Sequence, residues 1–207
     1  MNSSPTFDLW RSEPLLIVIS GPSGVGKDTV LQGLKARGLP FHFVVTATSR
    51  APRPGEAHGR DYFFYSQEVF ESMIERGELI EHAWVYGQYK GIPRSQVDEA
   101  LASGQDTILR VDVQGAEKVR SLYPQALLIF LVPASEEEWL ARLSNRATET
   151  EDTLRIRVDT VHSELDKISL FDYIVVNAQD CLDETLDAVE AIICAEHHRI
   201  PHRRINP

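Results

Sequence analysis

Short apolar runs alternate with amphipathic stretches along most of the chain. Residues 15–20 (LLIVIS) are branched and apolar and lead into a glycine and a proline, which predicts a buried strand. Residues 27–37 place their apolar side chains on one face, which predicts a helix. Further strands are predicted at residues 41–45, 107–111, 126–132 and 173–176, and helices at 94–102, 114–122, 136–143, 153–166 and 182–195. Strands that alternate with helices favour an α/β fold with a parallel sheet and right-handed crossovers.

The segment from about residue 47 to 93 has a different pattern. It is rich in Arg, Pro, Gly and aromatic residues, and it predicts loops, short strands and one helix at 67–76. We interpret it as a lobe inserted into a core made of residues 15–46 and 94–198. Residues 1–14 are expected to be an N-terminal extension. Residues 199–207 are polar and contain prolines, and they are expected to form a loose C-terminal tail.

The amino-acid composition and net charge exclude some classes of function. The chain has 207 residues, 43% of them hydrophobic and 25% charged, which is typical of a globular protein. Its formal net charge of −10 argues against a nucleic-acid surface, so positive charge for binding phosphate must be gathered locally. Cys181 and Cys194 have no metal-binding spacing and fit a reducing compartment. With no apolar run long enough for a membrane and no signal-peptide pattern, we expect a cytoplasmic protein, monomeric or homodimeric.

A glycine-rich turn follows the first predicted strand. It nearly matches the phosphate-loop pattern G-x-x-x-x-G-K-[ST]. Glycines at positions 24 and 26 let the backbone point its N–H groups at phosphates, and the next helix directs its positive end to the same place. Lys27 is expected to reach the β- and γ-phosphates of a nucleotide. The candidate ATP-binding residues here are Gly21, Pro22, Ser23, Gly24, Val25, Gly26, Lys27, Asp28 and Thr29.

One position departs from the phosphate-loop pattern. Asp28 stands where Ser or Thr normally holds Mg²⁺. Its carboxylate either binds Mg²⁺, directly or through water, or simply favours the start of the helix. Thr29 can still offer a hydroxyl to a phosphate.

A basic segment follows in this acidic chain. Arg50, Arg53 and Arg60 lie close together in the sequence, in a loop stiffened by Pro52 and Pro54, with Tyr62 nearby. Arginine suits bidentate contact with a phosphate, although a solvated basic loop would have the same composition.

Several motifs together resemble the guanylate kinases. They are GPSGVGK, TATSRAPRPGE, GRDYFF, ELIEHAWVYGQYKGIP, Asp112 with Gln114-Gly115, and RLSNRATETEDTLRIR, in one order from Leu15 to Val189. The segments GVGKD and VYGQYKGIP are most similar to those of the plastid and organellar type. The resemblance implies a P-loop kinase fold with an inserted mixed α/β GMP-binding lobe and a helical lid at about 143–158. It also implies transfer of the γ-phosphate of ATP to GMP or dGMP, with Mg²⁺.

The resemblance assigns roles on the GMP side. Arg50, Arg53 and Tyr62 match residues that hold the GMP phosphate. Glu81 matches a carboxylate that accepts hydrogen bonds from guanine N1–H and its amino group, and Thr46 offers a hydroxyl to the base. Glu56 and Asp112 match acidic positions in the cleft, and Asp112 is also a candidate for Mg²⁺. Lys90 stands where Tyr is common and Ile92 where Ser or Thr is, which leaves the strength of base discrimination open.

The resemblance also assigns catalytic residues. Arg142, Arg146 and Arg157 match the catalytic arginines of the family, and they act with Lys27. Arginines at helical spacing are by themselves more often a solvated face. Asn177 matches a position near the adenine of ATP.

Two other functions share parts of this pattern. A kinase of ribose 1,5-bisphosphate or another phosphorylated small molecule would use a similar phosphate loop, but it would not need Arg50, Arg53, Tyr62 and Glu81. A guanylate-kinase-like module that binds phosphopeptides would tend to lose the phosphate-loop glycines and Lys27, which are present here.

Overall fold

The computed structural model describes residues 13–85, 87–144 and 164–205. Its main sheet has five parallel strands in the order β2-β7-β1-β8-β9. The strands are β1 (Leu16–Ser20), β2 (Phe41–Phe43), β7 (Asp106–Arg110), β8 (Leu127–Val132) and β9 (Tyr173–Val176). The predicted parallel α/β core is therefore confirmed, with strand ends that differ from the prediction by no more than two residues.

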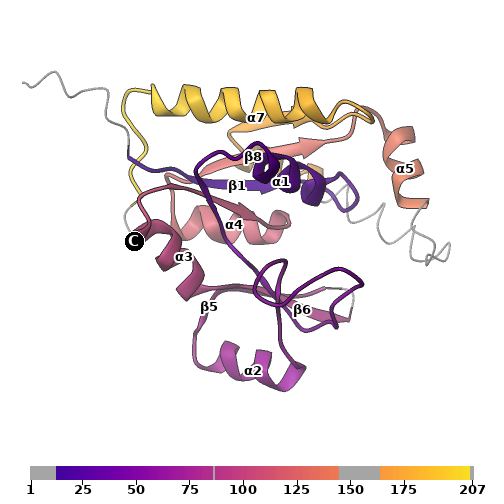
Figure 1. The fold of residues 1–207 in the computed structure, drawn as a ribbon, viewed down its shortest axis with the longest axis vertical. Helices are drawn as coiled ribbons and strands as arrows, with labels where there is room; N and C mark the ends of the chain where they lie inside the picture. The colour runs from indigo at the N-terminus through magenta and orange to yellow at the C-terminus, as the bar shows by residue number, and fades with distance from the viewer. Residues whose placement is uncertain (1–12, 86, 145–163, 206–207) are drawn as a thin grey trace, which may run out of the picture.

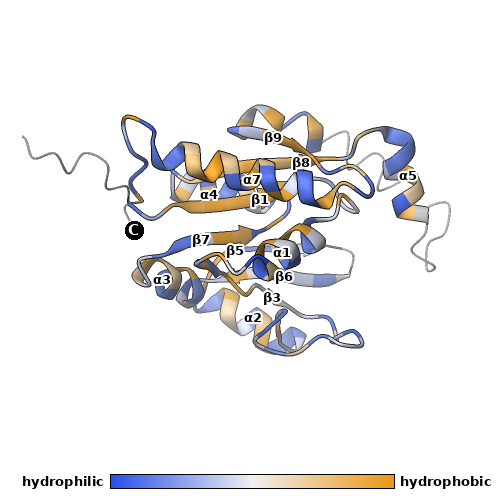
Figure 2. Ribbon diagram, turned by 45° about the horizontal axis from the view of Figure 1, so that its top comes forward, coloured by the Kyte–Doolittle hydropathy of each residue, from blue (hydrophilic) through white to orange (hydrophobic). Residues whose placement is uncertain are grey.

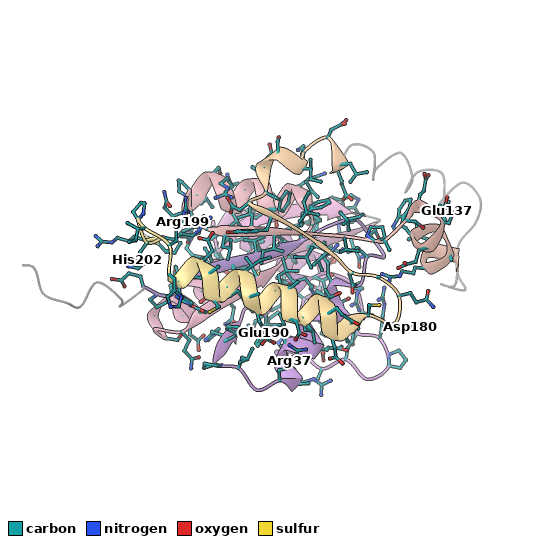
Figure 3. All side chains as sticks on the ribbon, turned by 90° about the horizontal axis from the view of Figure 1, so that it is seen from above. Arg37, Glu137, Asp180, Glu190, Arg199 and His202 are labelled. Atoms are coloured by element: carbon teal, nitrogen blue, oxygen red, sulfur yellow. The ribbon has the colours of Figure 1, made fainter. Side chains whose placement is uncertain are left out.

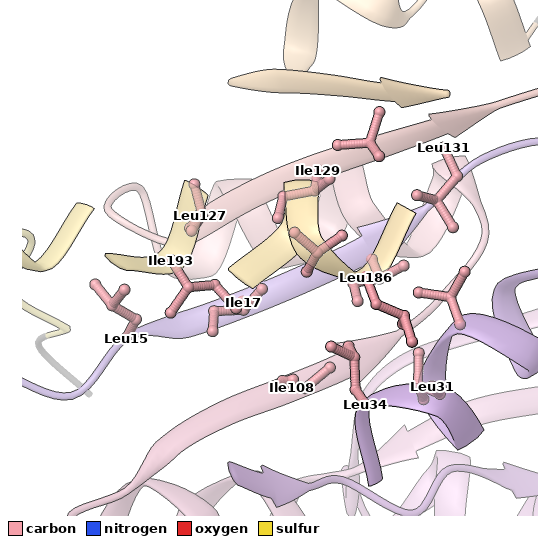
Figure 4. Packing of buried hydrophobic residues seen from close by; sticks show 14 of the residues in the cluster. Leu15, Ile17, Leu31, Leu34, Ile108, Leu127, Ile129, Leu131, Leu186 and Ile193 are labelled. Carbon is pink, nitrogen blue, oxygen red and sulfur yellow. The ribbon is translucent and has the colours of Figure 1, made fainter. Parts of the chain in front are cut away.

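Helices cover both faces of this sheet, and β1 shows why a strand covered on both sides is apolar along most of its length. Leu15, Ile17 and Ile19 pack with α1 (Lys27–Ala36) and α7 (Leu182–His197). Leu16 and Val18 point to the opposite face, toward α3 (Arg94–Ala102) and α4 (Val113–Leu122). Successive side chains of a strand point to opposite faces, so a sheet covered on both sides needs continuous apolar runs. Figure 2 shows these runs, and Figure 4 shows the packing beneath α1 and α7.

The pair α1 and α7 is also joined at the surface. Arg37 follows α1, and its guanidinium donates hydrogen bonds to Glu190 and Asp187 on α7, each at 2.7 Å (Figure 3). Both helices therefore form one layer over the sheet.

A second, mixed sheet lies beside the main sheet (Figure 1). It has the strand order β4-β3-β6-β5, with one parallel pair, β3 and β4. The strands are β3 (Ala47–Thr48), β4 (Phe63–Phe64), β5 (Leu79–Val85) and β6 (Gln88–Pro93). The helix α2 (Gln67–Glu75) closes this lobe by packing Phe70 and Met73 against Ala47 and Leu79. Ser66 caps α2, because its hydroxyl accepts a hydrogen bond from the Val69 N–H.

The expectation of a loose C-terminal tail is wrong for the residues described. Arg203 is only 6% exposed, and its Nε donates to a carboxylate oxygen of Glu196 at 2.6 Å. Its Nη1 also donates to the Ala126 carbonyl at 3.1 Å. A polar segment stays ordered when a buried carboxylate and backbone carbonyls offer its arginine partners.

The segment after the main sheet's fourth strand begins with α5 (Glu136–Ser144), and a 3₁₀ turn (Ile168–Leu170) precedes β9. Most of the expected lid at 143–158, and of the expected helix at 153–166, lies outside the described residues. Within the described chain, no helix is both long and apolar enough to cross a membrane.

Candidate active site

The turn between β1 and α1 has the geometry expected of a phosphate loop. Gly24 and Gly26 adopt φ values of +86° and +98°, which side chains rarely allow. A Cβ on Gly26 would lie 2.5 Å from Nδ2 of Asn177, so a side chain there would have to displace the Asn177 amide. The indole N–H of Trp139 donates to the Ser23 carbonyl at 2.8 Å and holds the loop from outside.

Lys27 is bound by its own loop. Its Nζ donates to the carbonyls of Gly21 at 2.5 Å and Pro22 at 3.0 Å. Burial lowers the pKa of Lys27 to about 8, although the nearby carboxylates of Glu164 and Asp112 favour the charged form. These contacts hold the ammonium group inside the loop, where a phosphate would be its natural counter-charge.

A cavity of about 290 Å³ separates the phosphate loop from the second sheet. The phosphate loop and the start of α1 line one side, and residues of the second sheet with the loop before β4 line the other. The end of β7 and the start of α4 lie between them. Predicted site residues in the lining are Ser23, Gly24, Gly26, Lys27, Asp28, Thr29, Thr46, Arg50, Arg53, Tyr62, Glu81, Lys90 and Asp112. The fold thus brings the two predicted nucleotide sites to one cavity.

The arginines before β4 take different positions. Arg50 makes a bidentate ion pair with Glu56, at 2.6 and 2.7 Å, and its guanidinium lies 5.0 Å from the centre of the Tyr62 ring. Arg50 lowers the pKa of Glu56 to about 2, and Glu56 also accepts a hydrogen bond from the Arg53 N–H. Glu56 is not a lining residue, so it orients Arg50 rather than facing the cavity. Arg60 pairs with the neighbouring aspartate, outside the lining.

Two of the carboxylates that line the cavity have raised pKa values. Burial, together with the charge of Asp112, raises the pKa of Glu81 to about 7, and the charge of Lys90 limits this rise. Burial likewise raises the pKa of Glu164 to about 7. One oxygen of Glu164 is buried without a hydrogen-bond partner among the described residues. Such groups are common where a protein binds or transforms a ligand.

The two residues predicted to bind a metal have different contacts. The Asp28 carboxylate forms an ion pair with the Arg110 guanidinium. Asp112 caps α4, because its Oδ1 accepts a hydrogen bond from the Gly115 N–H at 2.9 Å. The described residues contain no group of three His, Cys, Asp or Glu side chains that could hold a metal. Mg²⁺ bound to nucleotides needs only one or two protein carboxylates, so Asp112 fits such an ion better than the paired Asp28.

Arg142 and Asn177 support the phosphate loop from behind. Arg142 donates to the carbonyls of Val25 at 3.1 Å and Asn177 at 2.9 Å. The Asn177 side chain donates to Val25 at 2.6 Å and accepts from the Thr185 hydroxyl. Neither side chain lines the cavity, so their predicted roles toward ATP stay predictions. Arg146 and Arg157 lie outside the described residues.

Several further lining residues have little signal in the sequence. Arg110, Thr48 and Glu164 face the cavity, and none was predicted as a site residue. The one available signal was the charge of Arg110 itself, at the end of a buried strand and two positions before Asp112. Glu164 follows the expected lid and has no local pattern that marks it.

Comparison with known proteins agrees with this geometry. The family model "Guanylate kinase" matches residues 13–196. The chain belongs to the guanylate kinase family. It is 50% identical to "Guanylate kinase 2, chloroplastic/mitochondrial" of Oryza sativa subsp. japonica, over 94% of this chain and 68% of that protein. It is 44% identical to the guanylate kinase of Shouchella clausii, over 90% of each chain.

A solved structure of the family has the same architecture. The guanylate kinase of Anaplasma phagocytophilum is 31% identical to this chain, with a TM-score of 0.74, and the match covers 91% of this chain and 89% of that one. The expected P-loop kinase fold and the resemblance to an organellar relative are confirmed. The expected activity, ATP-dependent phosphorylation of GMP to GDP, is likewise confirmed at the level of the family.

Proposed function

We propose that the γ-phosphate of ATP passes directly to the phosphate of GMP or dGMP inside the cavity between the phosphate loop and the second sheet. One observation carries this proposal: Lys27 lines the same cavity of about 290 Å³ as Arg50, Arg53 and Glu81. A cavity with a donor site on one side and an acceptor site on the other suits in-line transfer.

On the donor side, the phosphate loop from Gly21 to Thr29 binds the ATP phosphates. The Nζ of Lys27 exchanges its loop carbonyls for β- and γ-phosphate oxygens, which are stronger partners because they are charged. Asn177, which braces the loop, lies next to the proposed adenine site.

On the acceptor side, Arg50 and Arg53 bind the GMP phosphate together with Tyr62 and Lys90. The ion pair with Glu56 orients Arg50 for this contact before GMP arrives. Glu81 accepts hydrogen bonds from guanine N1–H and the exocyclic amino group, while Thr46 offers its hydroxyl. Adenine has an acceptor at N1 and no 2-amino group, so it leaves Glu81 unpaired.

The transfer needs charge neutralisation rather than a general base, because the acceptor atom is already a phosphate oxygen. Arg142, Arg146 and Arg157 are the proposed lid and catalytic arginines, with a lid at about 143–158. Mg²⁺ with ATP would be held by Asp112 and phosphate oxygens, with Asp28 as a further candidate. When bound, the ion neutralises charge on the phosphates. We place this reaction in the cytoplasm, which fits the two free thiols.

Binding of GMP to a Glu81→Gln variant tests the acceptor site. We expect affinity to fall about 10- to 100-fold, because a charged hydrogen-bond acceptor is replaced by an amide that also presents a donor. The matched control is Glu75→Gln, an exposed change on α2 that should leave GMP affinity unchanged. Equal GMP affinity in wild type and Glu81→Gln would refute the assignment of Glu81.

A further inference from the structure

Arg110 is the last residue of β7 and lies between the two proposed substrate sites. Its strand partner is Ile19 on β1, the strand that leads directly into the phosphate loop. Its side chain is 16% exposed and lines the cavity. The guanidinium of Arg110 is therefore a cation close to both the proposed ATP site and the proposed GMP site.

The contacts of Arg110 join the two halves. Its guanidinium forms an ion pair with Asp28 at the start of α1. The same guanidinium lies 4.6 Å from the centre of the Tyr62 ring, and Arg50 lies 5.0 Å from that centre. Two guanidinium groups therefore converge on one tyrosine of the proposed GMP phosphate site.

The two arginines differ in how they are neutralised. Arg50 is held by both oxygens of Glu56, whose side chain is 20% exposed. The partner of Arg110 is Asp28, whose side chain is 62% exposed, so solvent screens that ion pair. Burial also lowers the pKa of Arg110 to about 10, which still leaves it charged at neutral pH. A buried guanidinium with a solvent-screened partner is a ready site for a phosphate.

We propose that Arg110 binds the phosphate of GMP from the side that faces the phosphate loop, and that Asp28 is the positioning residue that holds Arg110 there in the free enzyme. This proposal rests on the proposed function and adds a phosphate-binding residue to it. It also gives Asp28 a third role, beside the two that the sequence left open. Arg110 and Arg50 would then hold the acceptor phosphate from two sides.

A competing explanation is that Arg110 only neutralises Asp28 beside the triphosphate. The two explanations differ when both charges are removed. If Arg110 only balances Asp28, the double variant Asp28→Asn/Arg110→Met should bind GMP like wild type. If Arg110 contacts the phosphate, the double variant should bind GMP as weakly as Arg110→Met alone.

The test measures GMP binding by calorimetry without ATP, in wild type, Arg110→Met, Asp28→Asn and the double variant. Arg110→Met is expected to weaken GMP binding about 10- to 100-fold, the cost of one charged hydrogen-bonding partner. Guanosine lacks the phosphate, so its competition with GMP gives the affinity of the base site, which should be unchanged. Arg37→Met removes an ion-paired arginine outside the cavity and serves as the matched control.

Three results would overturn the proposal: unchanged GMP affinity in Arg110→Met, recovery in the double variant, or an equal loss of guanosine binding, which indicates a distorted lobe. If Arg110→Met does not fold, Arg110→Lys replaces it and is expected to bind GMP more weakly than wild type, because lysine lacks the bidentate fork. If wild type binds and phosphorylates GMP, and the Arg110 variants bind GMP as tightly as wild type does, only this inference is overturned. Wild type that does not bind GMP would instead overturn the proposed function.

Discussion

Charged groups are buried at both ends of the main sheet, but the two ends differ in the hydrogen-bond partners that these groups have. At the amino end of the strands, Glu196 accepts hydrogen bonds from Arg203 at 2.6 Å and from the Tyr173 hydroxyl at 2.7 Å. At the carboxyl end, Lys27 bonds only to carbonyls of its own loop among the contacts described, and Glu164 keeps a buried oxygen without a partner among the described residues.

This difference separates structural charges from functional ones. A buried ion pair whose members satisfy each other contributes to stability mainly because breaking it leaves a charge unpaired. Charged groups that are buried without full partners cost stability, and they persist where a ligand completes them. Variants at the cavity should therefore lose activity while keeping stability, and variants at the amino end should do the reverse.

The largest effect is expected from Lys27→Met. Turnover should fall by about 10²- to 10³-fold or more, because one charge that stabilises the transferred phosphoryl group is removed. The melting temperature should stay close to that of wild type, because the variant also removes a buried charge. Steady-state kinetics and thermal unfolding on the same preparation measure both. A stability loss as large as that of a variant at the amino end of the sheet would show that Lys27 is a structural charge as well.

Next comes Arg203→Met at the amino end. It leaves Glu196, which is 4% exposed, with only the more distant Arg199 at 3.7 Å as a cation among the described residues, at a cost of up to about 3–5 kcal/mol. In a chain of this size each kcal/mol lowers the melting temperature by about 2–4 °C. Turnover at low temperature should be unchanged. The exposed neighbour Arg204→Met is the matched control, and equal melting temperatures for the two variants would contradict the structural role of Arg203.

The smallest effect is a pH dependence of GMP binding. The pKa of Glu81 is raised to about 7 in the free protein, and the ionised form is the one that accepts the guanine hydrogen bonds. Affinity should therefore fall as pH decreases through 7, and at pH 6 it should be about tenfold lower than at a pH where Glu81 is fully ionised. The phosphate of GMP also titrates near pH 6, so Glu81→Gln serves as the reference that keeps this contribution. Identical slopes of affinity against pH for wild type and Glu81→Gln would show that Glu81 does not titrate in this way.

Much of the fold could be predicted because its signals are local. The apolar run before Gly21 and the glycines after it lie in one continuous stretch, so the strand, the loop and the helix could be read together. The acceptor site depended on a family resemblance, because its residues come from several short strands and loops that periodicity does not order.

The contacts that the sequence did not reveal join distant segments. Arg203 bonds to Ala126, 77 positions earlier, and Arg110 pairs with Asp28 across two elements. A polar tail residue and a charged strand end look solvent-exposed in sequence, because nothing local shows the partner that the fold brings to them.

The proposed reaction is the transfer of phosphate from ATP to GMP inside this cavity. A coupled assay of ADP release, with ATP and Mg²⁺ and with GMP, AMP, CMP, UMP or ribose 1,5-bisphosphate offered separately, tests it most directly. We expect rapid turnover with GMP and little turnover with the other acceptors. Turnover with the sugar phosphate alone, or no turnover in a folded protein that still binds GMP, would contradict it.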